Sequence, residues 1–285
     1  MKICRYNDDR LGIVEGDEVI DVTAALDVIP VSGWPAPLGD ALIANLDAVC
    51  DRASDLMTAG ERQSLSSVNL KSPVANPTKV IGAPVNYYAH QDEAIEDEGV
   101  SFGREIKTID HYGLFLKSPV LVGAGEGVDL HFTDRRNDHE VEMTMIIGET
   151  AKNVSYDNAL EHVAAYAIGL DMTVRGTEER SLRKAIDSYS VLGPWLVTAD
   201  EIPDPDKLNF SIHVGDEERQ NSNTEKLIFD CRKLIEYGSS FYTLYPGDVI
   251  MTGTPEGVGP VEPGDTMHCY CEGIGNMDVA VRAAG

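Results

Sequence analysis

The stretch DHEVEMTMII (Asp138–Ile147) changes from acidic residues to an apolar run that is typical of a buried strand. Side chains of a strand point alternately to its two faces, so Glu140 and Glu142 share one face, about 7 Å apart along the strand. If that face is buried, the two carboxylates must bind a cation or take up protons, and their oxygens suit Mg²⁺, Mn²⁺ or Ca²⁺. A solvated strand face that binds nothing is the alternative, because most acidic side chains in proteins are exposed.

Three further charged residues follow this strand in the sequence. Asp171 ends the apolar stretch AIGLD (Ala167–Asp171) and is a third candidate ligand, although the residue taken by itself is more typical of a turn or helix-cap aspartate. Arg175 and Lys184 lie shortly after it. Taken singly, Arg175 and Lys184 are each more typical of charged side chains on the solvated surface.

His90 and Glu93 are three residues apart in a segment with a helical pattern, so they lie on the same side of a helix. A carboxylate beside an imidazole orients its tautomer and raises its basicity, as a water-activating base requires. An exposed charge pair on an acidic helix is the alternative interpretation.

The composition of the 285 residues predicts a globular protein: 42% are hydrophobic, which is enough for a large core. The formal net charge of −25 opposes binding to nucleic acid and to anionic membranes. No stretch approaches the roughly 20 apolar residues that cross a bilayer, and the first residues lack the apolar region of a signal peptide, so we expect a cytoplasmic protein. The five cysteines are odd in number and form no C-x-x-C pair, which makes a disulfide framework improbable.

Short strands and one helical pattern near residues 38–59 form the beginning of the chain, and a linker rich in proline and polar residues spans Lys71–Thr78. We therefore predict a small N-terminal domain at residues 1–75 and a larger domain at residues 76–285. In the larger one, β-rich runs outnumber the helical patterns near residues 90–98, 156–166 and 227–239. Because the strands do not alternate regularly with helices, we expect an α+β domain with mixed sheets.

Eight motifs between about Lys79 and Met277 occur together in a recognisable order, and the sequence thereby resembles the fumarylacetoacetate hydrolase family. They are NYYAH (Asn86–His90), LFLKSP (Leu114–Pro119), EVE (Glu140–Glu142), DMTVR (Asp171–Arg175), LGPW (Leu192–Trp195), PGDVI (Pro246–Ile250), TGTPEGVG (Thr252–Gly259) and EGIG (Glu272–Gly275).

The resemblance implies a catalytic domain with the mixed β-sandwich roll of the family, a small N-terminal α/β domain, and a homodimer or higher homo-oligomer. Further implications concern single residues. Glu140, Glu142 and Asp171 fall on the family's ligand positions for Mg²⁺ or Mn²⁺, and His90 and Glu93 on its water-activating pair. Lys184 and Arg175 match cations that bind substrate or stabilise negative charge, and Thr254 matches a substrate-contacting threonine.

Glu178 stands where relatives often have a glutamine at the oxyanion site. An ionised glutamate opposes an oxyanion, so Glu178 is protonated, turned away, or used for a different substrate. We keep it among the substrate-binding candidates.

The implied activity is metal-dependent hydrolysis of a C–C bond in a 2,4-diketo acid, such as an acylpyruvate, a fumarylpyruvate-like compound or a 2,4-diketo-3-deoxy sugar acid, to pyruvate and a carboxylic acid. An isomerase or tautomerase, a decarboxylase or a hydratase that acts on a 2-oxo acid through a metal-stabilised enolate is the alternative. Two weaker hypotheses are a non-haem iron oxygenase that uses His90, Asp92 and a distal histidine such as His268, and a catalytically silent binding module.

Overall fold

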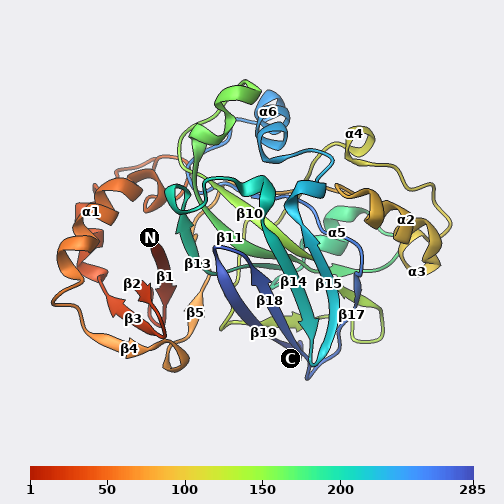
Figure 1. Ribbon diagram of the computed structural model, residues 1–285, viewed down its shortest axis with the longest axis horizontal. Coiled ribbons are helices and arrows are strands. Elements are labelled where there is room, and N and C mark those ends of the chain that lie inside the picture. The colour runs from red at the N-terminus through yellow and green to blue at the C-terminus, as the bar shows by residue number, and fades with distance from the viewer.

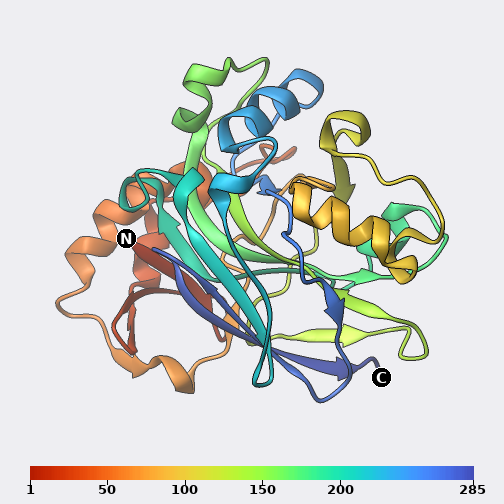
Figure 2. The same ribbon diagram turned by 45° about the vertical axis from the view of Figure 1, so that its right-hand side comes forward.

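The computed structural model describes all residues from Met1 to Gly285, and three β-sheets form its centre (Figures 1 and 2). The largest sheet has eleven strands, and only the pair β16–β6 in it is parallel. Its order is β4 (Arg62–Ser64), β3 (Glu18–Asp21), β2 (Arg10–Glu15), β1 (Lys2–Tyr6), β13 (Ser190–Thr198), β11 (Val163–Asp171), β10 (Val141–Ile147), β16 (Val249–Met251), β6 (Val80–Gly82) and β7 (Phe115–Lys117), with β5 (Leu70–Lys71) beside β1.

A five-stranded sheet packs across the large one, as Figure 1 shows, and a three-stranded sheet lies beside them. The five strands are, in order, β15 (Glu217–Asn223), β14 (Asn209–Val214), β18 (Thr266–Cys271), β19 (Gly275–Ala283) and β8 (Val128–Leu130). The three are β12 (Thr173–Val174), β9 (Asn137–His139) and β17 (Gly259–Pro260).

Helices are short and lie around the sheets. The α-helices are α1 (Leu46–Leu56), α2 (Tyr88–Glu96), α3 (Glu98–Ser101), α4 (Ile109–Tyr112), α5 (Arg180–Lys184) and α6 (Cys231–Phe241). The 3₁₀ helices are η1 (Thr23–Val28), η2 (Ile43–Asn45), η3 (Leu65–Ser67), η4 (Tyr156–His162), η5 (Ala199–Glu201), η6 (Pro205–Lys207) and η7 (Thr224–Lys226). No helix is both long enough and apolar enough to span a bilayer.

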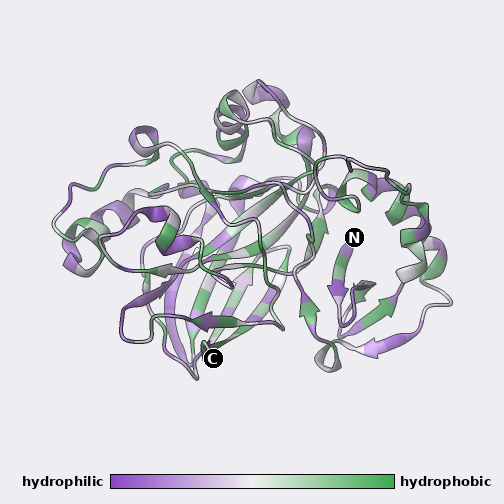
Figure 3. Cartoon of the chain, turned by 180° about the vertical axis from the view of Figure 1, so that it is seen from behind, coloured by the Kyte–Doolittle hydropathy of each residue, from purple (hydrophilic) through white to green (hydrophobic).

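Strand β10 is buried along its whole length because both faces of the large sheet are covered. Met143 and Met145 face the core shared with Phe210 of the five-stranded sheet. Ile146 faces a second core on the opposite side, which includes Val49 of α1. Figure 3 shows the corresponding hydrophobic colour along the central strands and hydrophilic colour on much of α2 and α3. The predicted α+β class with mixed sheets is thus confirmed.

One predicted helix is wrong in its second half. The helical pattern near residues 156–166 covers η4 and then the first residues of β11. Ala165 pairs with Ile146 of β10 and with Thr198 of β13, so hydrogen bonds to two neighbouring strands override the local pattern. The other helical patterns fall on α1, α2 and α6, with shifted ends.

The large sheet continues across the predicted domain boundary. Strand β1 of the N-terminal segment pairs with β13, with Lys2 opposite Val197, and β5 returns to β1. The predicted linker is held in place by Asp40, which accepts hydrogen bonds from the backbone N–H groups of Ala75 and Asn76, both at 2.9 Å. The division of the chain into two domains, at residues 1–75 and 76–285, stays a prediction.

Asp248 anchors the end of the linker to the C-terminal part of the large sheet. Its buried carboxylate accepts hydrogen bonds from the N–H groups of Thr78 and Lys79, both at 2.8 Å, and from the N–H of Tyr245 at 2.8 Å. Lys79 Nζ pairs with the same carboxylate at 2.9 Å.

We predict that Asp248→Ala lowers the free energy of unfolding by about 3 kcal/mol or more, because several buried donors lose their acceptor at about 1–3 kcal/mol each. Urea unfolding followed by circular dichroism measures the change. Asp129→Ala is the control, because its ion pair with Arg282 is exposed and contributes at most about 1 kcal/mol. Equal losses in the two variants would contradict the anchoring role.

Candidate active site

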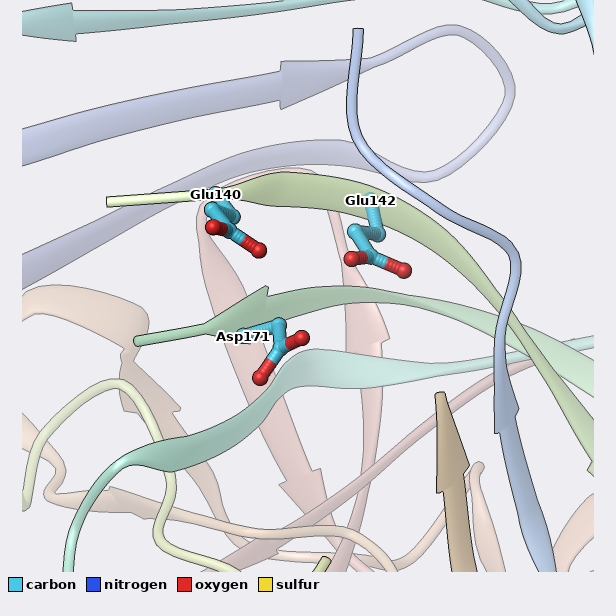
Figure 4. A group of neighbouring side chains, drawn as sticks. All are labelled: Glu140, Glu142 and Asp171. Carbon is cyan, nitrogen blue, oxygen red and sulfur yellow. The ribbon is translucent and has the colours of Figure 1, made fainter. Parts of the chain in front are cut away.

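Three buried carboxylates meet where β10 and β11 come together (Figure 4). Glu142 lies in β10, Glu140 directly precedes that strand, and Asp171 is the last residue of β11. The register places Glu142 opposite Gly169, and the N–H of Asp171 donates to the carbonyl of Glu140 at 2.9 Å. All three side chains therefore share one face, and their nearest oxygens lie within 4.8 Å of one another.

Two of these carboxylates are neutralised by buried cations. Lys184 Nζ donates to Glu140 Oε2 at 2.6 Å and to Asp171 Oδ2 at 2.7 Å, and Lys117 also pairs with Asp171. Arg175 donates to Glu140 Oε1 at 2.9 Å. Burial alone would raise the pKa of Glu140, but the charges of Lys184 and Arg175 outweigh it and hold this pKa well below its ordinary value.

Glu142 is the carboxylate that no side-chain cation contacts. Its Oε2 accepts only the N–H of Gly253, at 2.6 Å. Burial raises its pKa well above the ordinary value, and the charges of Asp171 and Glu140 raise it further. A divalent cation among the three carboxylates would remove this repulsion, and an all-oxygen donor set suits Mg²⁺ or Mn²⁺, so the residues fit such an ion.

His90 and Glu93 form the predicted pair on α2. Nδ1 of His90 lies 3.2 Å from Glu93 Oε2, which leaves Nε2 as the other ring nitrogen for a proton. Glu93 is itself fixed, because its Oε1 accepts the N–H of Gly257 at 2.9 Å. Gly257 has a φ of +93°, and a Cβ there would lie 1.9 Å from the carbonyl oxygen of Arg219, so only glycine fits this turn.

A cavity of about 330 Å³ opens beside these groups. Seven of the predicted site residues line it: His90, Glu140, Glu142, Asp171, Arg175, Lys184 and Thr254. Glu93 lies behind His90 and outside the lining. The structure thus brings together residues from α2, β10, β11, α5 and the loop after β16.

The structure turns Glu178 away from this cavity. Its carboxylate forms two hydrogen bonds with Arg135, at 2.9 and 2.8 Å, and the side chain is 37% exposed. This ion pair lowers the pKa of Glu178, which keeps it charged. The sequence left open whether Glu178 is protonated, turned away or used for a different substrate. The geometry favours a side chain that is turned away.

Thr254 reaches the cavity through a buried hydrogen-bond network. Its hydroxyl donates to the carbonyl of Val141 at 3.0 Å and accepts from Gln220 Nε2 at 2.8 Å. The amide oxygen of Gln220 accepts the N–H of Val141 at 3.1 Å, so the amide joins the start of β10 to the loop of Thr254. Only the fold reveals the role of Gln220, because nothing in the sequence near it indicates a site.

Lys117 and Asp138 are further residues of the site that reasoning from the sequence missed. Lys117 belongs to the LFLKSP motif, which was the available signal, and its ammonium group is fully buried against Asp171. Asp138 belongs to the quoted strand stretch and accepts from Arg175 Nε at 2.8 Å and from Arg136 Nε at 2.7 Å. Arg136 also binds Asp97, between α2 and α3, at 2.7 Å, so alternating charges connect these helices to the carboxylates.

The iron oxygenase hypothesis is wrong on geometric grounds. His268 lies on β18, where it is 45% exposed and pairs with Asp278 at 2.8 Å. Asp92 is exposed and, two residues from His90 on a helix, faces a different direction. Neither residue lines the cavity that contains His90.

Residues 79–282 match the family model described as fumarylacetoacetate (FAA) hydrolase, C-terminal. The chain belongs to this family. It is 55% identical over 286 residues to a maleylpyruvate hydrolase of Aquipseudomonas alcaligenes, covering 99% of this chain and 100% of the relative.

Solved structures of the family agree with this assignment. A maleylpyruvate hydrolase from Sphingobium sp. SYK-6, in complex with manganese(II) and pyruvate, superposes with a TM-score of 0.84 at 36% identity, and the match covers both chains completely. A 5-carboxymethyl-2-hydroxymuconate delta-isomerase from Mycobacterium smegmatis matches at a TM-score of 0.72 and 28% identity, again over both complete chains.

These relatives confirm the predicted activity in its general form. The chain is a metal-dependent hydrolase that cleaves a C–C bond of an acylpyruvate and releases pyruvate. The manganese complex of the relative and the acidic cluster of this chain also confirm a Mg²⁺ or Mn²⁺ cofactor.

We predict that Glu142→Gln weakens Mn²⁺ binding by at least about 10- to 100-fold. Losses of this size follow even when only a residue that hydrogen-bonds to a metal ligand is removed, and here a candidate ligand itself changes. Calorimetric titration with Mn²⁺ measures it, and the exposed Glu149→Gln is the control. Without metal, the variant unfolds at the same temperature as the wild type or a higher one, because one repelling charge is gone. Unchanged Mn²⁺ affinity would contradict the ligand assignment.

We predict that Glu178→Gln changes kcat/KM by less than about threefold, which corresponds to the weak contribution of an exposed ion pair. Steady-state measurement of pyruvate release tests this expectation. Arg175→Gln, which disturbs a cation lining the cavity, serves as the contrasting variant. A loss in Glu178→Gln as large as that in Arg175→Gln would place Glu178 in the substrate site.

Proposed function

We propose that this protein hydrolyses an acylpyruvate of the maleylpyruvate type to pyruvate and a four-carbon dicarboxylic acid. The observation that carries the proposal is one cavity into which the three carboxylates, His90 and Lys184 all open. The 55% identity to a maleylpyruvate hydrolase supports the choice of substrate class.

In the proposed site, Glu140, Glu142 and Asp171 hold the divalent cation. Once bound, the cation supplies Lewis acidity and orients the 2-oxo acid end of the substrate. Lys184, fixed by Glu140, Asp171 and the hydroxyl of Thr173 at 2.6 Å, presents a positive charge beside the same end. Arg175 keeps Glu140 ionised and oriented towards the cavity.

His90 acts as the general base in this proposal. With Nδ1 directed to Glu93, Nε2 takes a proton from water, and the water oxygen adds to the distal carbonyl carbon of the substrate. The bond between that carbon and C3 of the pyruvate unit then breaks. Its electron pair becomes the enolate of pyruvate, whose charge Lys184 stabilises, and a proton from the imidazolium completes pyruvate. Thr254 borders the same cavity, and because its hydroxyl proton is donated to the carbonyl of Val141, it presents an acceptor oxygen to the substrate.

The proposed enzyme is a cytoplasmic homodimer or higher homo-oligomer. All five cysteines are free, and four of them are buried, as expected in a reducing compartment. Val31 and Trp34, 100% and 98% exposed in one loop, are the most exposed large apolar residues and are candidates for a subunit contact. Light scattering after size-exclusion chromatography determines the oligomeric state.

We predict that His90→Asn lowers kcat for maleylpyruvate by about 10²- to 10⁴-fold, the usual contribution of a general base, while Mn²⁺ affinity stays within about threefold. Pyruvate release in the presence of Mn²⁺ is the measurement. His268→Asn is a matched control, because it also removes a histidine paired with a carboxylate, but outside the cavity. Full activity of His90→Asn would exclude the proposed base.

The reaction type is tested separately with the wild-type enzyme in ¹⁸O-labelled water. Hydrolysis places solvent oxygen in the new carboxylate of the dicarboxylic product, whereas isomerisation or decarboxylation does not. The relative named as an isomerase makes this comparison necessary. A rearranged product without pyruvate would overturn the proposal.

A further inference from the structure

The catalytic cavity has a cationic wall in a protein whose net charge is −25. Besides Lys184 and Arg175, which bind the carboxylate cluster, three more arginines line it: Arg104, Arg180 and Arg183. Arg180 and Arg183 belong to α5, and Arg104 follows α3. These three residues are called the arginine wall below.

No residue of the arginine wall forms an ion pair, whereas most arginines of this chain do. Arg104 donates to the carbonyl of Thr177 at 2.8 Å, and Arg183 donates to the carbonyl of Glu178 at 2.9 Å. Arg180 lies over the rings of Tyr112 and Phe115, 5.2 Å from each centroid. Most guanidinium donors of the arginine wall thus remain free to bind a ligand.

Two of these guanidinium groups are partly withdrawn from water without a carboxylate in contact. Burial lowers the pKa of Arg180 and of Arg183 below the ordinary value for arginine. Glu105 also lines the cavity, but it is exposed, and Lys107 pairs with it at 3.4 Å. An uncompensated buried charge is costly, and an anionic ligand would compensate it with charge-assisted, bidentate hydrogen bonds.

The arginine wall lies at a distance from the carboxylate cluster that suits a short substrate. Arg180 and Lys184 are four residues apart in α5, which is about 6 Å along a helix axis. Both cations contact the ring of Phe115, Arg180 at 5.2 Å and Lys184 at 5.4 Å from its centroid. A molecule whose 2-oxo acid end lies at Lys184 therefore reaches Arg180 through a few carbon atoms.

We propose that Arg180 and Arg183, with Arg104 on the same side of the cavity, bind a second carboxylate at the acyl end of the substrate and make the enzyme selective for dicarboxylic acylpyruvates. This inference rests on the proposed function and adds its specificity determinants. An acylpyruvate with a plain alkyl end would leave the guanidinium groups partly desolvated and unpaired, so the site discriminates against it. Lys184 and the three carboxylates serve the opposite end of the molecule.

The decisive experiment compares kcat/KM for maleylpyruvate with kcat/KM for acetylpyruvate, which lacks the second carboxylate. We expect Arg180→Gln and Arg183→Gln each to lower the ratio of the two values by roughly 10- to 100-fold, the contribution of a hydrogen bond between charged groups. The value of kcat/KM for acetylpyruvate does not fall and can rise, because the variants no longer leave a guanidinium group unpaired beside the alkyl end. Arg180→Lys, which retains a positive charge, recovers part of the ratio.

Arg232→Gln is the matched control, because Arg232 also donates to a backbone carbonyl, that of Asp157 at 3.0 Å, but lies outside the cavity. An unchanged ratio in both α5 variants overturns the inference. Equal losses for both substrates also overturn it, because they indicate general damage to the site rather than recognition of the second carboxylate.

A binding measurement separates this inference from the proposed function. Maleate and isocrotonate (cis-2-butenoate), which share the cis double bond and differ in that a methyl group replaces one carboxylate, are titrated into the Mn²⁺-loaded wild type and into the Arg180→Gln, Arg183→Gln double variant. If neither acylpyruvate is hydrolysed, the proposed function fails, yet maleate binding that is tighter than isocrotonate binding and lost in the double variant still supports the arginine wall. Equal binding of maleate by the two proteins overturns it.

Discussion

The mutual repulsion of three buried carboxylates is the constraint on which the rest of the site depends. Glu140, Glu142 and Asp171 are each at most 5% exposed and share one end of the strand pair β10–β11. Lys184, Lys117 and Arg175 compensate Glu140 and Asp171, whereas Glu142 has only a backbone N–H. Because the protein supplies cations to two carboxylates and not to the third, a divalent ion bound in the proposed site would complete the charge balance of the fold as well as its chemistry.

The two-sided burial of the large sheet explains why the carboxylates can be held so closely. Alternate residues of β10 pack into two separate cores, so this strand cannot shift by one residue without exchanging its faces. The face that carries Ile146 in the N-terminal core is the one that carries Glu142 at the other end of the strand. The N-terminal strands, which join the same sheet through β1 and β13, thereby help to fix the geometry of a site to which they contribute no residue.

The sequence predicted those parts of the site that depend on local periodicity. Strand alternation placed Glu140 and Glu142 on one face, and helical spacing paired His90 with Glu93, because both patterns are set by neighbouring residues. Asp171 and Thr254 were assigned through family motifs, since their proximity to Glu142 depends on strands far apart in the chain. Local pattern failed near residues 156–166, where pairing with β10 and β13 converts the end of a predicted helix into β11.

The cationic side chains around the cavity could not be inferred from the composition. A net charge of −25 suggests a poor binder of anions, but the excess acids are spread over the whole chain, whereas Arg104, Arg180, Arg183 and Lys184 gather around one cavity. At physiological ionic strength the Debye length is about 8 Å, so most of the distant acids are screened from a ligand inside. Contacts within the cavity are screened far less. Local placement, and not the overall charge, therefore determines whether a polyanionic substrate binds, and only the fold reveals that placement.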